Sequence, residues 1–293
     1  MGKSMLILTC VIVLFACAAI ESRDFEATKI IQRYLKMPHP KDDKLGEARL
    51  ARLEALAELK AMPKEAVSAI GRALSEVKEP RQRYELAGML GDTFHTEESA
   101  ALLCGLLKDP SDKVRWQAIH GLRMTARRTD RSGAKRIQRR PDFAPEVEGL
   151  VPYLISAAGD KAEGNRVCAL YALADTRDPS AVSELRKRLK DPSEKVRLYA
   201  ACFLTEYQDA AGLPEMRDAL ARLRRTRPVD VLDYYWQAER LLASFERITG
   251  KSFGQIPLNP NLCSVDHGET KRYKALVDTW AEWWAWEPKA GEK

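Results

Sequence analysis

The sequence predicts an all-α protein, an α-solenoid of about five helical hairpins with a helical cap at each end. Three observations support this fold class. A nine-residue motif occurs twice, 82 residues apart, a shorter helical pattern recurs between and before the two copies, and strand signals are nearly absent. A single short hairpin cannot bury its apolar face alone, but stacked hairpins share a continuous core.

The longer motif runs from Leu107 to Arg115 and returns almost unchanged from Leu189 to Arg197. The shorter pattern is an Arg followed three, four and seven residues later by small or apolar residues, usually ending in Leu. Its arginines are 34, 32, 51 and 31 residues apart, so one interval is enlarged. They are Arg49 (a weaker copy), Arg83, Arg115, Arg166 and Arg197. This periodicity predicts hairpins at about 45–76, 80–108, 111–157, 163–190 and 193–225.

The hairpins carry signals for helix starts. Asp109 and Asp191 each precede a proline, which predicts an N-cap acceptor followed by proline at the first helical position. An acidic residue three positions after each Asp completes the pattern of a capping box. Asp178 precedes another proline, so a second helix is expected to begin there.

The repeated residues quoted above resemble the HEAT repeat, in the short variety found in phycobilin-lyase-type proteins, over roughly residues 45–225. The resemblance implies a right-handed superhelix of the ARM/HEAT type. It also implies that Arg115 and Arg197 make structural bonds to the aspartates of neighbouring turns. Such repeats mostly build binding surfaces, so the resemblance is specific for fold and not for a particular function.

The first residues indicate export. Residues 1–18 combine a lysine, an apolar run and small residues around Cys17, as in a signal peptide. The apolar run is short for a spanning helix. Leu14 to Cys17 also resembles a bacterial lipobox, in which the signal ends at residue 16 and Cys17 is lipidated. We therefore expect a periplasmic protein or a membrane-anchored lipoprotein.

Both ends of the repeat region are predicted to be helical caps, over residues 22–44 and 226–288. The second contains a Thr-Gly-x-x-Phe-Gly turn and a Trp-rich last helix. This ending is similar to one seen after HEAT-like repeats in exported proteins of planctomycete-type bacteria. Trp280, Trp283 and Trp284 share one helical face, which favours a lid on the last repeat over a stripe that stacks on sugar or lies in a membrane interface.

The enlarged interval holds a basic insertion, residues 123–141. Eight Lys and Arg against one Asp give it a charge of +7, compared with +6 for the whole chain. Insertions in repeat proteins often lie on the binding side, so we expect an anionic ligand or an acidic partner protein; a solvated loop is the alternative. The predicted binding residues are Trp116, Arg123, Arg127, Arg128, Arg131, Lys135, Arg136, Arg139 and Arg140.

Other candidate sites are weak. Gly250-Lys251-Ser252 lacks the first glycine of a phosphate-binding loop, so Gly250 is predicted to end a helix. Cys104, Cys168 and Cys202 lie in apolar helical patterns, which favours buried thiols. No His-Glu pair of the kind that holds iron in helical-repeat hydroxylases is present, and neither is a Gly-x-Ser-x-Gly elbow. The group from Cys263 to His267 lacks further ligands nearby. We expect no catalytic residue, cofactor or metal.

The sequence therefore predicts an exported, non-catalytic scaffold that binds a protein or an anionic ligand. One alternative is an enzyme of the phycobilin-lyase type or another HEAT-repeat enzyme. Another is a nucleic-acid-binding protein built on similar repeats, such as a DNA-lesion glycosylase. Export conflicts with both, and the basic insertion lacks the interleaved aromatic residues that stack on bases.

Overall fold

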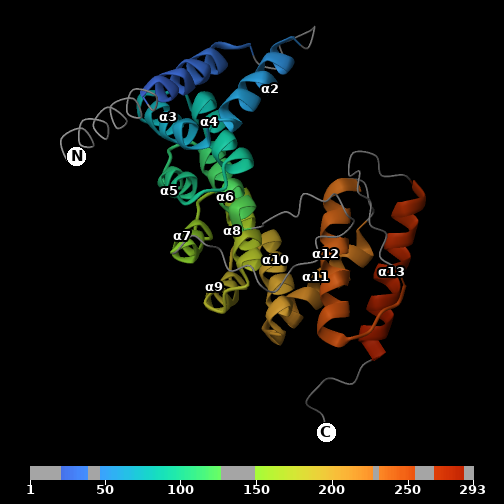
Figure 1. The fold of residues 1–293 in the computed structure, drawn as a ribbon. Helices are drawn as coiled ribbons and strands as arrows, with labels where there is room; N and C mark the ends of the chain where they lie inside the picture. Colours follow the sequence, from blue (N-terminus) through green and yellow to red (C-terminus); the bar gives the residue numbers. More distant parts are fainter. Residues whose placement is uncertain (1–20, 39–46, 127–148, 227–230, 255–266, 287–293) are drawn as a thin grey trace, which may run out of the picture. The chain divides into compact units, whose positions relative to one another are not determined.

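The computed structural model describes residues 21–38, 47–126, 149–226, 231–254 and 267–286. Within these ranges the chain forms helices and no strand, which confirms the all-α prediction. The chain divides into two compact units, Met1–Leu150 (unit 1) and Val151–Lys293 (unit 2), shown in Figure 1.

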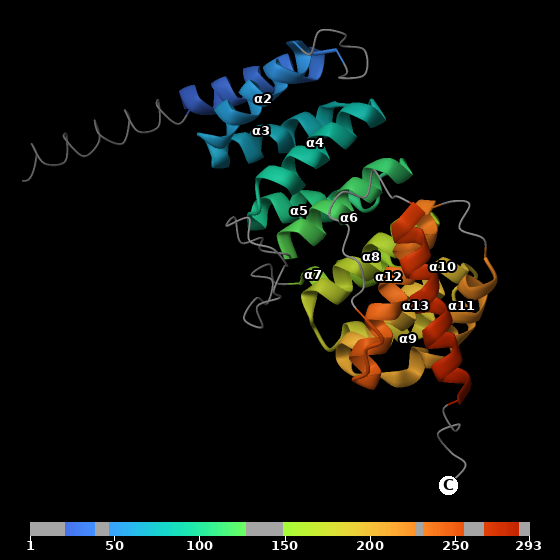
Figure 2. The same ribbon diagram turned by 90° about the vertical axis from the view of Figure 1, so that its right-hand side faces the viewer.

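Unit 1 is a stack of helical hairpins that follows a helix over residues 21–36. Helix α4 packs against α3, α5 and α6, and Figure 2 shows these helices stacked side by side. Leu59, Ile70, Leu90 and Ile119, from four different helices, are fully buried in this layer. The helices of unit 1 are α2 (Glu47–Lys60), α3 (Pro63–Glu76), α4 (Pro80–Thr93), α5 (Glu97–Leu106) and α6 (Asp112–Ala126).

Unit 2 continues the hairpins and adds two long helices. Its helices are α7 (Leu150–Ala157), α8 (Glu163–Thr176), α9 (Ala181–Arg188), α10 (Glu194–Leu204), α11 (Leu213–Arg225), α12 (Val231–Thr249) and α13 (His267–Trp286). The 3₁₀ turns η1 (Thr205–Tyr207) and η2 (Ala210–Gly212) connect α10 to α11. Helix α10 packs against α8, α9, α11 and α12 and forms the centre of this unit.

The Trp-rich helix α13 closes unit 2. It packs against α11 and α12, and Trp280 is buried with its ring stacked 5.3 Å from the ring of Phe245. The ring of Trp284 lies 4.9 Å from Phe245, while Trp283 is partly exposed. The stripe is therefore part of the core of this unit, as expected for a lid.

The predicted N-caps were wrong by two residues. Helix α10 begins at Glu194, and its N-cap is Ser193, whose hydroxyl accepts a hydrogen bond from the Val196 N–H at 3.3 Å. The Asp191 carboxylate instead accepts the N–H of Ser193, two residues ahead. Asp109 accepts the N–H of Ser111 in the same way, and α6 begins at Asp112. Each Asp forms a turn before the helix because its carboxylate also binds an arginine of the preceding hairpin.

The first helices of neighbouring hairpins meet in two different ways. In unit 1, a Cβ added to Gly91 of α4 would lie 2.3 Å from the Cα of Gly121 in α6, so two glycines set a very close approach. In unit 2, Tyr171 of α8 contacts Phe203 of α10 edge-on, with ring centroids 4.8 Å apart. Aligning the arginines of the repeat pattern places Gly121 and Phe203 at the same position of their repeats.

Candidate functional site

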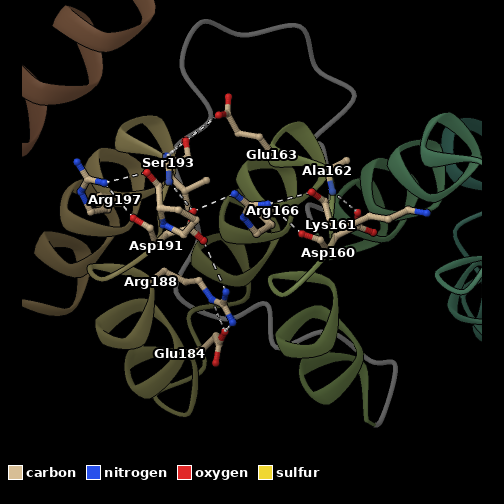
Figure 3. Close-up of polar contacts among 12 residues, drawn as sticks. Asp160, Lys161, Ala162, Glu163, Arg166, Glu184, Arg188, Asp191, Ser193 and Arg197 are labelled. Carbon is tan, nitrogen blue, oxygen red and sulfur yellow. Dashed lines mark hydrogen bonds and ion pairs between the residues drawn. The ribbon is translucent and has the colours of Figure 1, made fainter.

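Two of the repeated arginines, Arg83 and Arg166, each bind the aspartate in the turn before the next hairpin. Figure 3 shows the contacts of Arg166. In unit 2, Arg166 of α8 donates from Nη1 to the main-chain oxygen of Asp160, at 3.0 Å, in the turn before its own helix. Its Nη2 donates to Oδ1 of Asp191 at 2.9 Å, in the turn before α10. Arg197 repeats the first contact, donating to the main-chain oxygens of Asp191 and Pro192.

Asp191 is the centre of this network. Its side chain is 2% exposed and also lies 3.7 Å from Nη1 of Arg188, which in turn binds Glu184 at 2.6 Å. Burial alone would raise the pKa of Asp191. Hydrogen bonds from Arg166 and the Ser193 N–H, together with the charges of Arg166 and Arg188, outweigh burial and hold this pKa below its usual value.

The same arrangement recurs in unit 1. Arg83 of α4 places its Nε 2.9 Å from Oδ2 of Asp109 and donates from Nη2 to Oδ1 at 3.1 Å. Arg115 donates to the main-chain oxygens of Asp109 and Pro110. Arg115 and Arg197 therefore bind the main chain of their own preceding turns. The aspartate carboxylates bind Arg83 and Arg166, which corrects part of the expectation for Arg115 and Arg197.

One surface of unit 1 that carries exposed aromatic residues lies on α4 and α6. Trp116 is 37% exposed, and its ring stacks on the ring of His120, one turn further along α6, at 5.2 Å. Nδ1 of His120 lies 3.8 Å from Oδ1 of Asp92 in α4, and the Asp92 side chain is 57% exposed. An aromatic pair and a carboxylate thus share one surface.

Two residues of α4 complete this surface. Tyr84, one position after its repeat arginine, is 37% exposed, like Trp116 at the matching position of α6. Gly88, one turn after Tyr84, has no side chain, and a Cβ placed there would lie 3.3 Å from Nε2 of Gln117 and 3.9 Å from Oδ2 of Asp92. We call Tyr84, Gly88, Asp92, Trp116 and His120 the aromatic notch.

Sequence reasoning found only part of this surface. Of the predicted binding residues, Trp116 and the partly exposed Arg123 lie on α6. Arg127, Arg128, Arg131, Lys135, Arg136, Arg139 and Arg140 lie outside the described residues, as do Cys17 and Cys263. The prediction missed Tyr84, although its place directly after Arg83 matches that of Trp116 after Arg115 and could have indicated it.

A second surface feature of unit 1 is a cleft of about 440 Å³ between the end of the first helix, α2 and α4. Arg52 lines it and lies 3.2 Å from Glu85, donates to the main-chain oxygen of Met37 and covers the ring of Tyr34. The charged residues of the cleft are two arginines and two glutamates, so the lining has no net charge. These contacts hold the helices together and identify no ligand.

The remaining candidates have structural roles. Gly250 has a φ of 69° and its N–H donates to the Glu246 carbonyl, which confirms that it ends α12. Cys104, Cys168 and Cys202 are buried thiols, as predicted. Desolvation raises the pKa of Cys104 and that of Cys202 to about 11. In the described ranges, no group of three or more His, Cys, Asp or Glu side chains is placed to hold a metal ion.

None of the helices within the described residues has the length and apolar character needed to cross a membrane.

The helical hairpins are stacked, and repeated arginines contact the turns that precede the helices. These features define a helical-repeat protein. Residues 148–233 match the family model described as HEAT repeats, so this part of the chain carries HEAT repeats. No curated protein matches the chain.

Solved structures with a similar arrangement include three of low similarity. A designed armadillo repeat protein in complex with the peptide (KR)4 is 16% identical, with 76% of this chain and 99% of that chain covered and a TM-score of 0.41. Escherichia coli YibA is 18% identical, with coverages of 77% and 91% and a TM-score of 0.31. Human deoxyhypusine hydroxylase in complex with glycerol is 18% identical, with coverages of 89% and 98% and a TM-score of 0.28.

Proposed function

We propose that the protein is an exported, non-catalytic scaffold that binds an acidic partner protein through α6 and the basic segment that follows it. The observation that carries this proposal is the exposed Trp116, stacked on the half-buried His120, on the helix that leads through Arg123 into residues 123–141. Aromatic residues and arginines are the residue types enriched at the centres of protein interfaces.

Charge supports an acidic partner. The arginines of the repeat pattern bind turn aspartates and main-chain oxygens, so their contacts are internal to the fold. The segment 123–141 carries a charge of +7 in a chain whose total charge is +6. Its positive charge is thus a local property that attracts an acidic surface at long range.

The proposal also places the protein outside the cytoplasm. Residues 1–18 have the composition of a signal peptide, and Cys17 offers a lipid attachment site within it. A partner would then be a periplasmic or envelope protein. Mass spectrometry of the mature N-terminus from fractionated cells tests this point, since an intact Met1 in the cytosol would contradict export.

Binding of fluorescent poly-glutamate to the purified protein tests the charge argument. We expect the triple variant Arg127→Gln, Arg128→Gln, Arg131→Gln to weaken binding about tenfold at low salt, and the effect to shrink at high salt because of screening. Lys161→Gln, Lys187→Gln, Lys190→Gln is the matched control, because it removes the same charge from exposed residues of unit 2. Equal losses in both variants would show that only net charge matters and would refute a local site.

A further inference from the structure

We propose that the exposed face of α2 pairs with the same face of a second copy of this chain, so that the protein forms a reversible dimer. Within the described residues, this face carries the two most exposed large aliphatic side chains, Leu50 at 63% and Leu53 at 57%. Ala57, one turn after Leu53, is also exposed. The three residues lie on one side of the helix because they are three and four positions apart.

The later repeats bury the position that α2 exposes. Leu53 stands four residues after its repeat arginine, Arg49. The residues at this position in the other four repeats are all fully buried, and they are Ala87, Ile119, Leu170 and Ala201. Helix α2 belongs to the first hairpin of the stack, and an apolar surface at the end of a repeat stack has to be covered for the protein to stay soluble.

The contacts of α2 with its own unit leave this face available. They lie on the opposite side of the helix, where the buried residues are Ala48, Arg52, Ala55 and Leu59. On that side, Arg52 lies 3.2 Å from Glu85 of α4 and donates to the main-chain oxygen of Met37. A partner on the leucine face therefore displaces none of these contacts.

The charges beside the leucines favour a second copy in a parallel, two-fold arrangement. In a parallel helix pair, residues at heptad positions a and d meet their counterparts, and position g of one helix faces position e of the other. With Leu50 at a and Leu53 at d, the exposed Arg49 occupies g and the exposed Glu54 occupies e. Two-fold symmetry then forms the Arg49–Glu54 pair twice. An antiparallel pair would instead place like charges side by side.

The length of the apolar stripe limits the strength of this contact. Lys60 occupies the next position of the pattern after Ala57, so the stripe covers about two helical turns. Such a contact is smaller than the roughly 1,200 Å² that stable interfaces bury. We therefore expect a dimer whose population rises with protein concentration.

Analytical ultracentrifugation of the purified protein at several concentrations tests the inference. We expect a monomer–dimer equilibrium that Leu53→Glu weakens about tenfold, because two carboxylates would meet at the centre of the contact. Tyr153→Glu is the matched control, since it adds the same charge to a side chain that is 49% exposed on α7. A monomer at every concentration, or equal association of Leu53→Glu and the parent protein, would overturn the inference.

Charge reversal tests the arrangement of the two helices. Arg49→Glu and Glu54→Arg should each weaken association about fivefold at low salt, because each places like charges together. The double variant Arg49→Glu, Glu54→Arg should recover the association of the parent protein, since both pairs form again with their signs exchanged. Arg49 also has a contact in its own chain, so thermal unfolding of each variant checks the fold. A double variant that stays weakened would contradict the parallel pair.

This inference does not rest on the proposed function. The face of α2 includes neither the aromatic notch nor the basic segment 123–141. Poly-glutamate binding measured on the same variants reports the proposed function separately, because Leu53→Glu leaves the basic segment intact.

Discussion

The helix pairs α4–α6 and α8–α10 belong to the same repeat pattern but are packed by opposite means. Between α4 and α6, glycine faces glycine, and a Cβ on Gly91 would lie 2.3 Å from the Cα of Gly121. Between α8 and α10, rings fill the interface: Tyr171 lies 4.8 Å from Phe203 and 5.2 Å from Tyr199. Helix α12 adds the guanidinium of Arg240, 5.0 Å from the ring of Tyr171.

The comparison shows that the repeat pattern determines which helices pack together. The residue at one position of the repeat then determines how closely the two helices approach. Gly121 and Phe203 follow their repeat arginines by the same interval, yet one removes all side-chain volume and the other adds a large ring. In unit 1 the two glycines bring the backbones of α4 and α6 into direct contact. In unit 2, the corresponding volume belongs to the core, where Phe203 is 1% exposed.

Truncating the aromatic interface should have the largest effect. We expect Phe203→Ala to lower the free energy of unfolding of unit 2 by about 4 kcal/mol, because a fully buried ring leaves a cavity. Hydrogen exchange with peptide resolution would show the loss in α8, α10 and α12. Unchanged protection in these helices would mean that the rings do not hold the interface.

Adding a methyl group to the glycine interface between α4 and α6 should lower the free energy of unfolding by a slightly smaller amount. We expect Gly91→Ala to destabilise unit 1 by about 3 kcal/mol, because the new methyl group meets the backbone of α6 and the helices must separate. Urea unfolding followed by circular dichroism measures the loss. Gly105→Ala in α5 is the control: nothing lies within 4 Å of its Cβ position, so higher helix propensity should stabilise the protein slightly.

The turn aspartates offer a test of what the two units share. We expect Asp191→Ala to lower the free energy of unfolding by about 3 kcal/mol, because the largely buried Arg166 and Arg188 lose the carboxylate that both contact. Asp109→Ala should cost about 2 kcal/mol, since it frees only Arg83, whose side chain is 16% exposed. Thermal unfolding of both variants compares them, and an equal or reversed order would show that Arg188 adds nothing to the network.

Acidification should have the smallest of these effects on stability. The folded-state pKa of Asp191 is lowered, so its contribution is present above the unfolded-state pKa of about 3.9 and is lost as pH falls through the lower folded-state value. The stability of unit 2 should therefore decline below about pH 4. In Asp191→Asn this part of the decline should be missing from unfolding curves at pH 4 and below, and a slope identical to that of the parent protein would contradict this assignment.

Sequence periodicity predicted the helices well because each one repeats local chemistry. The hairpins from 45–76 to 193–225 contain the helix pairs of the structure, and Gly250 ends α12 as expected. The helix starts were misplaced at Asp109 and Asp191 because the same acid can cap a helix or form the turn before it. Binding of the distant Arg83 and Arg166 favours the turn, and nothing local to the motif indicates this.

The candidate surface was harder to predict because it depends on contacts between repeats. Trp116 was predicted from the sequence as a binding residue, and the structure adds that it is exposed. Gly88, Gly91 and Gly121 looked like isolated glycines in helices, which ordinarily only weaken a helix. Their role follows from the meeting of two helices, which one sequence does not show. The basic residues after Arg123 remain a prediction, because they lie outside the described residues.

The buried thiols have a consequence for the reactivity of the two units. Thiolate is the form that reacts with oxidants, and desolvation holds Cys104 and Cys202 in the thiol form at neutral pH. Alkylating reagents should therefore modify them only when the surrounding helices open. Since Cys104 lies in α5 and Cys202 in α10, the rates at which these two residues are alkylated would report the opening of each unit separately, without an added label.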